Sequence, residues 1–168
     1  MKLNVGNKVI YPSHGPCIIN SIVNKIVDEK PMAFYQLLVL NDGHGTLLVP
    51  VDKIMSIGIR PLLDQPEILK LWDQLKQPST ASSDRRQRVR DNLVLLKSGS
   101  AFDLAEIVES LTELIETKQL SFGERGTLER AKKLLVYEIS EVTGETKQEV
   151  EEQVDRALVA RTTKASVA

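Results

Sequence analysis

The sequence contains few cysteine, histidine and aromatic residues. Of its 168 residues, one is cysteine, two are histidine and 4% are aromatic. A single cysteine excludes an intramolecular disulfide and is typical of a reducing cytoplasm. The chain also lacks an apolar run approaching the roughly 20 residues that span a bilayer. Residues 1–8 lack the apolar core of a signal peptide. We therefore expect a soluble, cytoplasmic protein with no membrane partner.

The few metal-ligating residues form no strong motif. His14 and Cys17 are spaced as H-x-x-C, and His44 is the only other histidine. Three such ligands would suit a catalytic zinc better than a structural one, but an isolated pair is a weak signal. Cys17 leads an apolar segment and is typical of a small buried hydrophobic residue. Phosphate-binding loops and nucleophile motifs are also missing from the sequence. We expect no metal, no cofactor and no enzyme; the rival hypothesis, an enzyme using His14 and Cys17, predicts a stoichiometric metal.

Charge is nearly balanced overall but unevenly placed. The net charge of -1 argues against a protein whose whole surface binds nucleic acid. Residues 1–60 carry six basic and four acidic side chains, residues 82–100 carry five and two, and residues 101–168 carry nine and fourteen. One short basic segment thus stands between neutral and acidic ones, and such a local patch matters more than the sum.

Residues 1–62 are expected to form an antiparallel β domain. Short β-branched or apolar segments alternate with turn residues, including Asn41 and Gly43 in a hairpin signal. The candidate strands cover residues 8–11, 17–27, 34–40, 46–51 and 54–59. Five short strands predict a small closed barrel of the Tudor or SH3 kind. Segments 37–40 and 47–49 are apolar on both faces, which indicates either tight packing or a hydrophobic surface for a protein partner.

Residues 63–168 are expected to form a compact domain of five amphipathic helices, so the fold class is α+β. Capping boxes are predicted at Asp64, Ser121 and Thr146, and Gly144 is a candidate left-handed cap. Trp72 lies on the apolar stripe of the first helix, which predicts a core position. Residues 78–83 are predicted to be a loop or linker.

The second helix, from about residue 84 to 97, is basic at its start. Val89, Leu93 and Leu96 are predicted to form its apolar stripe. Its four arginines, which oppose the helix dipole, are Arg85, Arg86, Arg88 and Arg90. Two interpretations stay open: a solvated, partly salt-bridged face, or a binding site for an anionic partner.

The chain resembles the CarD/CdnL family of bacterial RNA-polymerase-binding transcription regulators up to about residue 158. The first module carries VGNKVIYPSHG at 5–15, LLVP at 47–50 and IGIR at 57–60. The helical part carries RDNL at 90–93, KSG at 97–99, LAEIV at 104–108, LSFGE at 120–124 and AKKLL at 131–135. The first module is also similar to the polymerase-interaction module of the transcription–repair coupling factor, a helicase that this chain is too short to contain.

The resemblance implies that residues 1–62 bind the lobe of the RNA polymerase β subunit. By position, the polymerase-contacting residues fall on Lys25 and Val27 of the second strand and on Leu48 and Pro50. Leu48 stands where the family has a basic residue, so part of this interface is apolar here. The resemblance also places the protein on the bacterial nucleoid through RNA polymerase.

The resemblance further implies that residues 63–168 touch promoter DNA at the upstream edge of the bubble and stabilise the open complex. Many family members carry a tryptophan wedge at the start of the basic helix, where this chain has Arg85. An arginine does not insert between base steps as an apolar wedge does, but it can enter a narrow minor groove or bind phosphate. The expected DNA contacts, weak and largely independent of base sequence, are Arg85, Arg86, Arg88, Arg90 and Lys97.

Two functional hypotheses follow. The first is a transcription regulator that binds polymerase through its β module and DNA through its basic helix. The second is a non-enzymatic protein–protein adaptor of RNA polymerase without direct DNA contact, which the missing wedge and the acidic residues 101–168 favour. We expect a monomer in either case.

Overall fold

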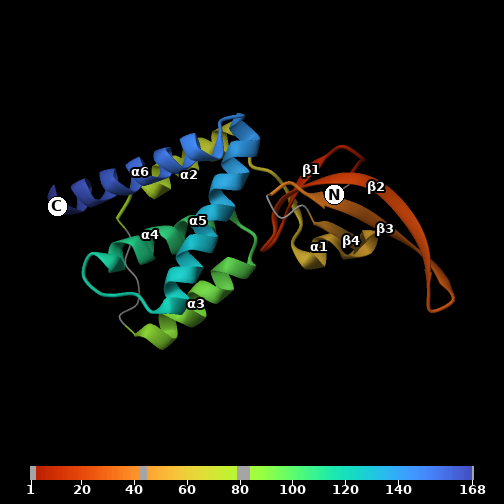
Figure 1. Ribbon diagram of the computed structural model, residues 1–168, viewed down its shortest axis with the longest axis horizontal. Coiled ribbons are helices and arrows are strands. Elements are labelled where there is room, and N and C mark those ends of the chain that lie inside the picture. Colours follow the sequence, from red (N-terminus) through yellow and green to blue (C-terminus); the bar gives the residue numbers. More distant parts are fainter. Residues whose placement is uncertain (1–2, 42–44, 79–83, 168) are drawn as a thin grey trace. The chain divides into compact units, whose positions relative to one another are not determined.

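The chain divides into two compact units, Met1–Leu62 and Leu63–Ala168. The computed structural model describes residues 3–41, 45–78 and 84–167 (Figure 1). Residues 42–44 of the expected hairpin, with His44, and residues 79–83 of the expected linker lie outside the described residues.

The N-terminal unit is built on an antiparallel sheet in the order β4-β3-β2-β1-β5. Its strands are β1 (Lys8–Tyr11), β2 (Gly15–Val27), β3 (Lys30–Val39), β4 (Thr46–Pro50) and β5 (Arg60–Pro61). Strands β2 and β3 form a long hairpin whose two-residue turn, Asp28 and Glu29, has positive φ at both positions (50° and 64°). Positive φ at both central residues matches the right-handed twist of the flanking strands.

The expected closed barrel is not what forms, because the sheet is open. Among the described strands, β4 and β5 lie at the two edges and do not pair with each other. The predicted strand over residues 54–59 is also wrong. That segment holds the short helix α1 (Ile54–Ile57) and Gly58, which caps α1 with a φ of 90°, and it follows the 3-10 helix η1 (Val51–Lys53). Isoleucine content indicated a strand, but Gly58 in a left-handed conformation ends a helix.

One face of the sheet packs on the core of this unit. Val9, Cys17, Leu37 and Val49 are almost fully buried there, and Ile54 and Ile59 pack on the same cluster. Because successive side chains of a strand point to opposite faces, the residues between these buried ones form a second face.

The described residues contain six α-helices, one more than the five expected. The C-terminal unit contains five of the six. They are α2 (Gln65–Leu75), α3 (Arg85–Lys97), α4 (Ala101–Ile115), α5 (Phe122–Thr143) and α6 (Lys147–Val167). The capping boxes predicted at Asp64 and Ser121 are confirmed. Thr146 and Glu149 exchange the same pair of bonds at the start of α6.

Apolar stripes of α2, α4, α5 and α6 build a single core. Leu71, Leu111, Leu135, Ile139 and Val154 have no exposed surface within it. Trp72 is half-buried and packs against this core. Among the described residues, no helix combines the length and apolar character needed to cross a bilayer.

Candidate functional site

The sheet brings the four residues predicted to bind polymerase onto one face. Val23 lies opposite Phe34, and Phe34 lies opposite Pro50, so these three side chains form a row on the same side. Lys25 and Val27 follow Val23 at intervals of two along β2, and Leu48 precedes Pro50 by two along β4. With a side-chain period of two, all four project from the side opposite the core.

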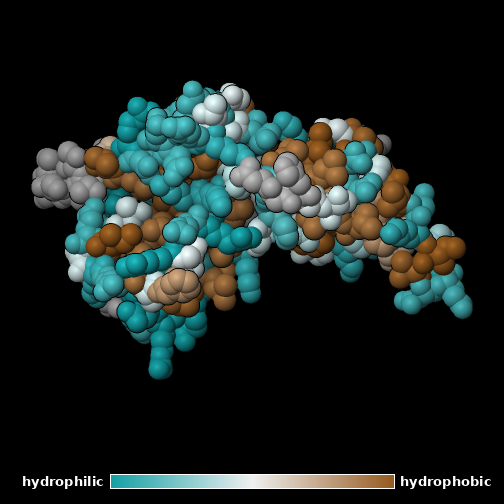
Figure 2. Space-filling view, in the orientation of Figure 1, coloured by the Kyte–Doolittle hydropathy of each residue, from teal (hydrophilic) through white to brown (hydrophobic). Residues whose placement is uncertain are grey.

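We name this side the outer face and define it by Val23, Lys25, Val27, Met32, Phe34, Leu48 and Pro50. Val27, Met32 and Leu48 are among the exposed large hydrophobic side chains of the chain. Figure 2 shows hydrophobic side chains gathered over this unit and reaching the end of the β2–β3 hairpin. Sequence reasoning missed Met32 and Phe34, because their contribution depends on the register of β3 against its neighbours.

The outer face ends at an edge strand. β4 pairs with β3 on one side and with no other described strand. The free edge of a strand can hydrogen-bond to a strand of another protein. An exposed aliphatic surface beside such an edge is typical of a protein interface.

In the C-terminal unit, helix α3 buries a side only partly the same as the one predicted. Of the expected stripe of Val89, Leu93 and Leu96, Leu96 packs on the core beside Leu95, whereas Val89 and Leu93 are exposed and Arg88 and Asn92 are buried. The N-cap is Asp84, whose carboxylate accepts a hydrogen bond from the Arg86 amide. On its buried side, α3 packs Leu95 and Leu96 on the core and makes one bidentate polar contact with α5.

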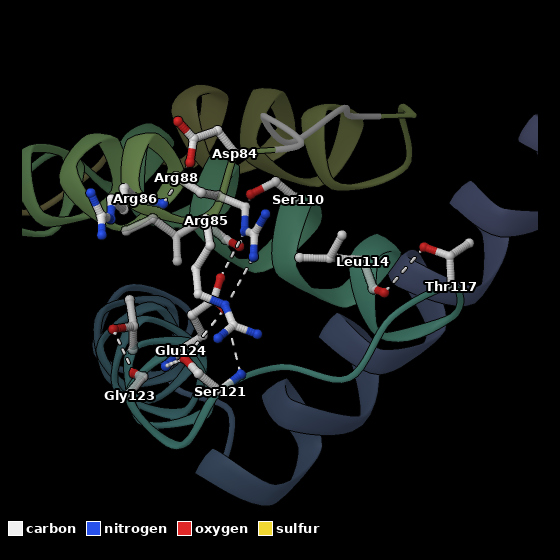
Figure 3. Close-up of polar contacts among 12 residues, drawn as sticks. Asp84, Arg85, Arg86, Arg88, Ser110, Leu114, Thr117, Ser121, Gly123 and Glu124 are labelled. Atoms are coloured by element: carbon white, nitrogen blue, oxygen red, sulfur yellow. Dashed lines mark hydrogen bonds and ion pairs between the residues drawn. The ribbon is translucent and has the colours of Figure 1, made fainter.

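That contact is an ion pair between Arg88 and Glu124 of α5. Arg88 is 5% exposed and Glu124 is 3% exposed. The guanidinium donates two bonds, Nε to Oε2 at 2.7 Å and Nη2 to Oε1 at 3.1 Å (Figure 3). The hydrogen bond from Arg88 lowers the pKa of Glu124, and the same bond raises the pKa of Arg88. Bidentate geometry of this kind is the strong form of a charged hydrogen bond.

Arg88 is therefore a structural residue that holds α3 to the start of α5. A guanidinium buried against Glu124 presents no surface to phosphate, so the expectation that Arg88 contacts DNA is corrected. Sequence reasoning took Glu124 only as a capping residue. Its Oε1 does accept the capping bond from the Ser121 amide, and it also accepts from Arg88.

The remaining cations of α3 are exposed. Nε of Arg85 lies 3.8 Å from Oε1 of Glu124 with its side chain 63% exposed. Arg86, Arg90 and Lys97 have exposed side chains. At about 100° of rotation per residue, these three fall within about 40° of one another and opposite Arg88. Figure 3 shows Arg86 directed away from Glu124, whereas Arg85 and Arg88 point toward it.

The candidate metal ligands do not form a site in the described residues. No group of three or more His, Cys, Asp or Glu that could hold a metal occurs within residues 3–41, 45–78 and 84–167. Cys17 is buried, and burial raises its pKa to about 11. His14 is exposed, and its ring meets the Tyr11 ring edge-on at 4.9 Å between centroids. His44 is outside the described residues.

Two family models match the chain, one for each unit. The model described as "CarD-like/TRCF RID domain" matches residues 3–63. The model described as "CarD, C-terminal domain" matches residues 70–155, which is more than half of the chain.

Two similar proteins carry related names. The Bacillus subtilis (strain 168) protein "Putative transcription factor YdeB" is 29% identical over 150 residues, which cover 87% of this chain and 95% of that protein. A solution NMR structure of the 72-residue N-terminal domain of Myxococcus xanthus CarD is 30% identical, covers 36% of this chain and 79% of that one, and has a TM-score of 0.31. Because the CarD C-terminal model matches more than half of the chain and the CarD-like/TRCF model matches its N-terminal unit, the chain belongs to the CarD/CdnL family of transcription regulators.

Proposed function

We propose that this protein regulates transcription by binding the lobe of the RNA polymerase β subunit and promoter DNA at the upstream edge of the bubble, which stabilises the open complex. The observation that carries the proposal is the pairing of two different surfaces in one chain. One is the apolar outer face beside a free strand edge, and the other is the exposed cation row of α3.

The outer face supports the polymerase half of the proposal. Lys25, Val27, Leu48 and Pro50 share this face, and the β4 edge beside it can pair with a strand of the polymerase lobe. Aliphatic residues supply buried area, and backbone pairing supplies alignment. Leu48 replaces a basic position of the family, so this part of the contact is apolar rather than ionic.

The exposed cations of α3 support the DNA half. Arg85, Arg86, Arg90 and Lys97 remain candidates, and Arg88 does not. Each phosphate neutralised lowers log K by roughly 0.9 per log unit of salt, so three or four contacts give weak and salt-sensitive binding. Attachment to polymerase raises the effective DNA concentration around α3. Contacts available only when the bubble is open favour the open state, which is a population shift by differential affinity.

A second candidate is an adaptor of polymerase that does not touch DNA. Burial of Arg88 favours it, because the pairing with Glu124 removes one cation from the surface. The excess of acidic residues after residue 100 also repels phosphate.

One experiment separates the two candidates by measuring polymerase binding and open-complex lifetime with the full chain. We expect Val27→Glu to weaken binding to purified bacterial polymerase by at least about tenfold, since a charge would be placed in an apolar contact. Ile26→Glu is the matched control: Ile26 is 79% exposed and projects from the other face of the same strand.

For the DNA half, the double variant Arg86→Glu/Arg90→Glu should bind polymerase as the wild type does and shorten the lifetime of the open complex. An unchanged lifetime would favour the adaptor. Equal losses for Val27→Glu and Ile26→Glu would contradict the assignment of the outer face.

A further inference from the structure

Helix α3 exposes aliphatic side chains that its sequence pattern assigns to a core. Val89 is 47% exposed, Leu93 49% and Val94 69%. The same helix buries Arg88 and Asn92 instead. Single exposed aliphatic residues are ordinary on protein surfaces, but here three lie within two turns of one helix, and we call them the apolar strip.

The aliphatic residues lie among the exposed cations. Measured from Arg90 at about 100° per residue, Arg86 and Lys97 lie within about 40°, Leu93 about 60° to one side and Val94 about 40° to the other. Along the axis, Leu93 is about 4.5 Å from Arg90 and about 6 Å from Lys97. Leu93 thus occupies a gap in the cation row.

No acidic side chain of α3 lies on the Leu93 side of the cation row. Asp84 caps the helix by accepting from the Arg86 amide. Asp91 accepts a 2.7 Å hydrogen bond from Gln87 and lies about 100° from Arg90. The face around Leu93 therefore combines positive charge with aliphatic surface.

We propose that Leu93, with Val94 beside it, contacts the deoxyribose and base-edge surface of the DNA groove between phosphates neutralised by Arg86, Arg90 and Lys97. The inference rests on the proposed function and adds an apolar component to it. A DNA groove offers two rows of phosphates with less polar sugar and base surface between them. Charge complementarity selects DNA as the occupant, because a row of cations flanks Leu93 on a side of α3 that carries no carboxylate of this helix.

The two kinds of contact differ in their dependence on salt. Phosphate neutralisation releases counterions and sets the slope of log K against log salt. Burial of aliphatic surface releases no counterions, so it adds the same affinity at every salt concentration. A variant that loses an aliphatic contact should shift the line without changing its slope.

The test is a titration of the full chain into a fluorescent promoter-like duplex with a short unpaired bubble, repeated over a series of salt concentrations. We expect Leu93→Ala to weaken binding about fivefold at each concentration with the slope unchanged. Arg90→Gln should instead lower the slope by about 0.9. Leu69→Ala makes the same chemical change at a residue of α2 that is 65% exposed, and it should bind as the wild type does.

Leu93→Met is a control for misfolding, because methionine keeps most of the apolar area of leucine. Its affinity for the duplex should be within about twofold of that of the wild type. Wild-type affinity for Leu93→Ala would overturn the inference while leaving the DNA half of the proposed function in place. No salt-dependent binding by the wild type would overturn that half and the inference with it. Loss of polymerase binding by Leu93→Ala with unchanged DNA binding would assign the strip to a protein partner instead.

Discussion

The two units expose apolar residues for different reasons. In the N-terminal unit, the core covers only one face of β4, so Leu48 is exposed while its neighbour Val49 is buried. At the end of β2, Ile26 and Val27 are both exposed, so the core covers neither face there. In the C-terminal unit, α3 pairs Arg88 with Glu124 of α5 and packs Leu95 and Leu96 on the core, which leaves Val89 and Leu93 exposed. An exposed apolar surface can thus follow from local geometry in one unit and from the tertiary packing of a helix in the other.

The largest expected effect tests the ion pair of the helical unit. Arg88→Ala should destabilise the protein by about 3–5 kcal/mol, because it leaves the Glu124 carboxylate buried without its partner. Urea unfolding followed by circular dichroism measures the loss. Arg86→Ala removes an exposed arginine two residues away and should change stability by less than about 0.5 kcal/mol. Similar values for the two variants would mean that Arg88 does not set the position of α3.

The next effect compares the two faces of the sheet. Leu37 has no exposed surface and Leu48 is 42% exposed. Leu37→Ala should cost about 2–5 kcal/mol through the cavity it leaves. Leu48→Ala should cost less than about 0.5 kcal/mol, since an exposed side chain leaves no cavity. Thermal unfolding of both variants measures the difference, and a large loss for Leu48→Ala would place it in a core rather than on a binding face.

The smallest effect concerns another buried carboxylate of the helical unit, Glu109. Desolvation by burial raises the pKa of Glu109 to about 7, the Gln74 side chain opposes the rise, and Glu106, Arg161 and Glu113 exert smaller effects. Its Oε1 has no hydrogen-bond partner.

Because the folded-state pKa of Glu109 lies above the unfolded value, its favourable contribution is complete below about pH 4.5 and is lost as the pH rises through about 7. Glu109→Gln should therefore raise stability at alkaline pH by up to about 3 kcal/mol and change it little in acid. Unfolding free energies measured across this pH range check the prediction. Parallel curves for the wild type and the variant would contradict it.

The sequence predicted features that depend on residues close together in the chain better than features that depend on distant residues. The capping boxes at Asp64, Ser121 and Thr146 were predictable because the bonded groups are three residues apart. The strand segments of β1 to β4 followed from composition and turn residues. The helix α1 was missed, since four residues ending at a glycine carry too little periodicity to outweigh an isoleucine-rich composition.

The sequence predicted which residues form the candidate site, but not how these residues are arranged in space. Lys25, Val27, Leu48 and Pro50 came from the family pattern, and only the register of β2, β3 and β4 places them on a common face. Their role in polymerase binding stays a prediction, as does DNA contact by Arg85, Arg86, Arg90 and Lys97. The direction of each side chain required the structure.

By itself, the sequence determined what depends on neighbours along the chain: the helix caps, the strand segments, the basic helix and the family to which the chain belongs. Tertiary structure decided that the sheet stays open, that four residues on two strands share a face, and that α3 turns its aliphatic side outward. The side that α3 buries carries Arg88, which meets Glu124, 36 residues later in the chain, together with Leu95 and Leu96, which pack on the core. A helix can bury only one side at a time, and no local pattern contains these distant contacts.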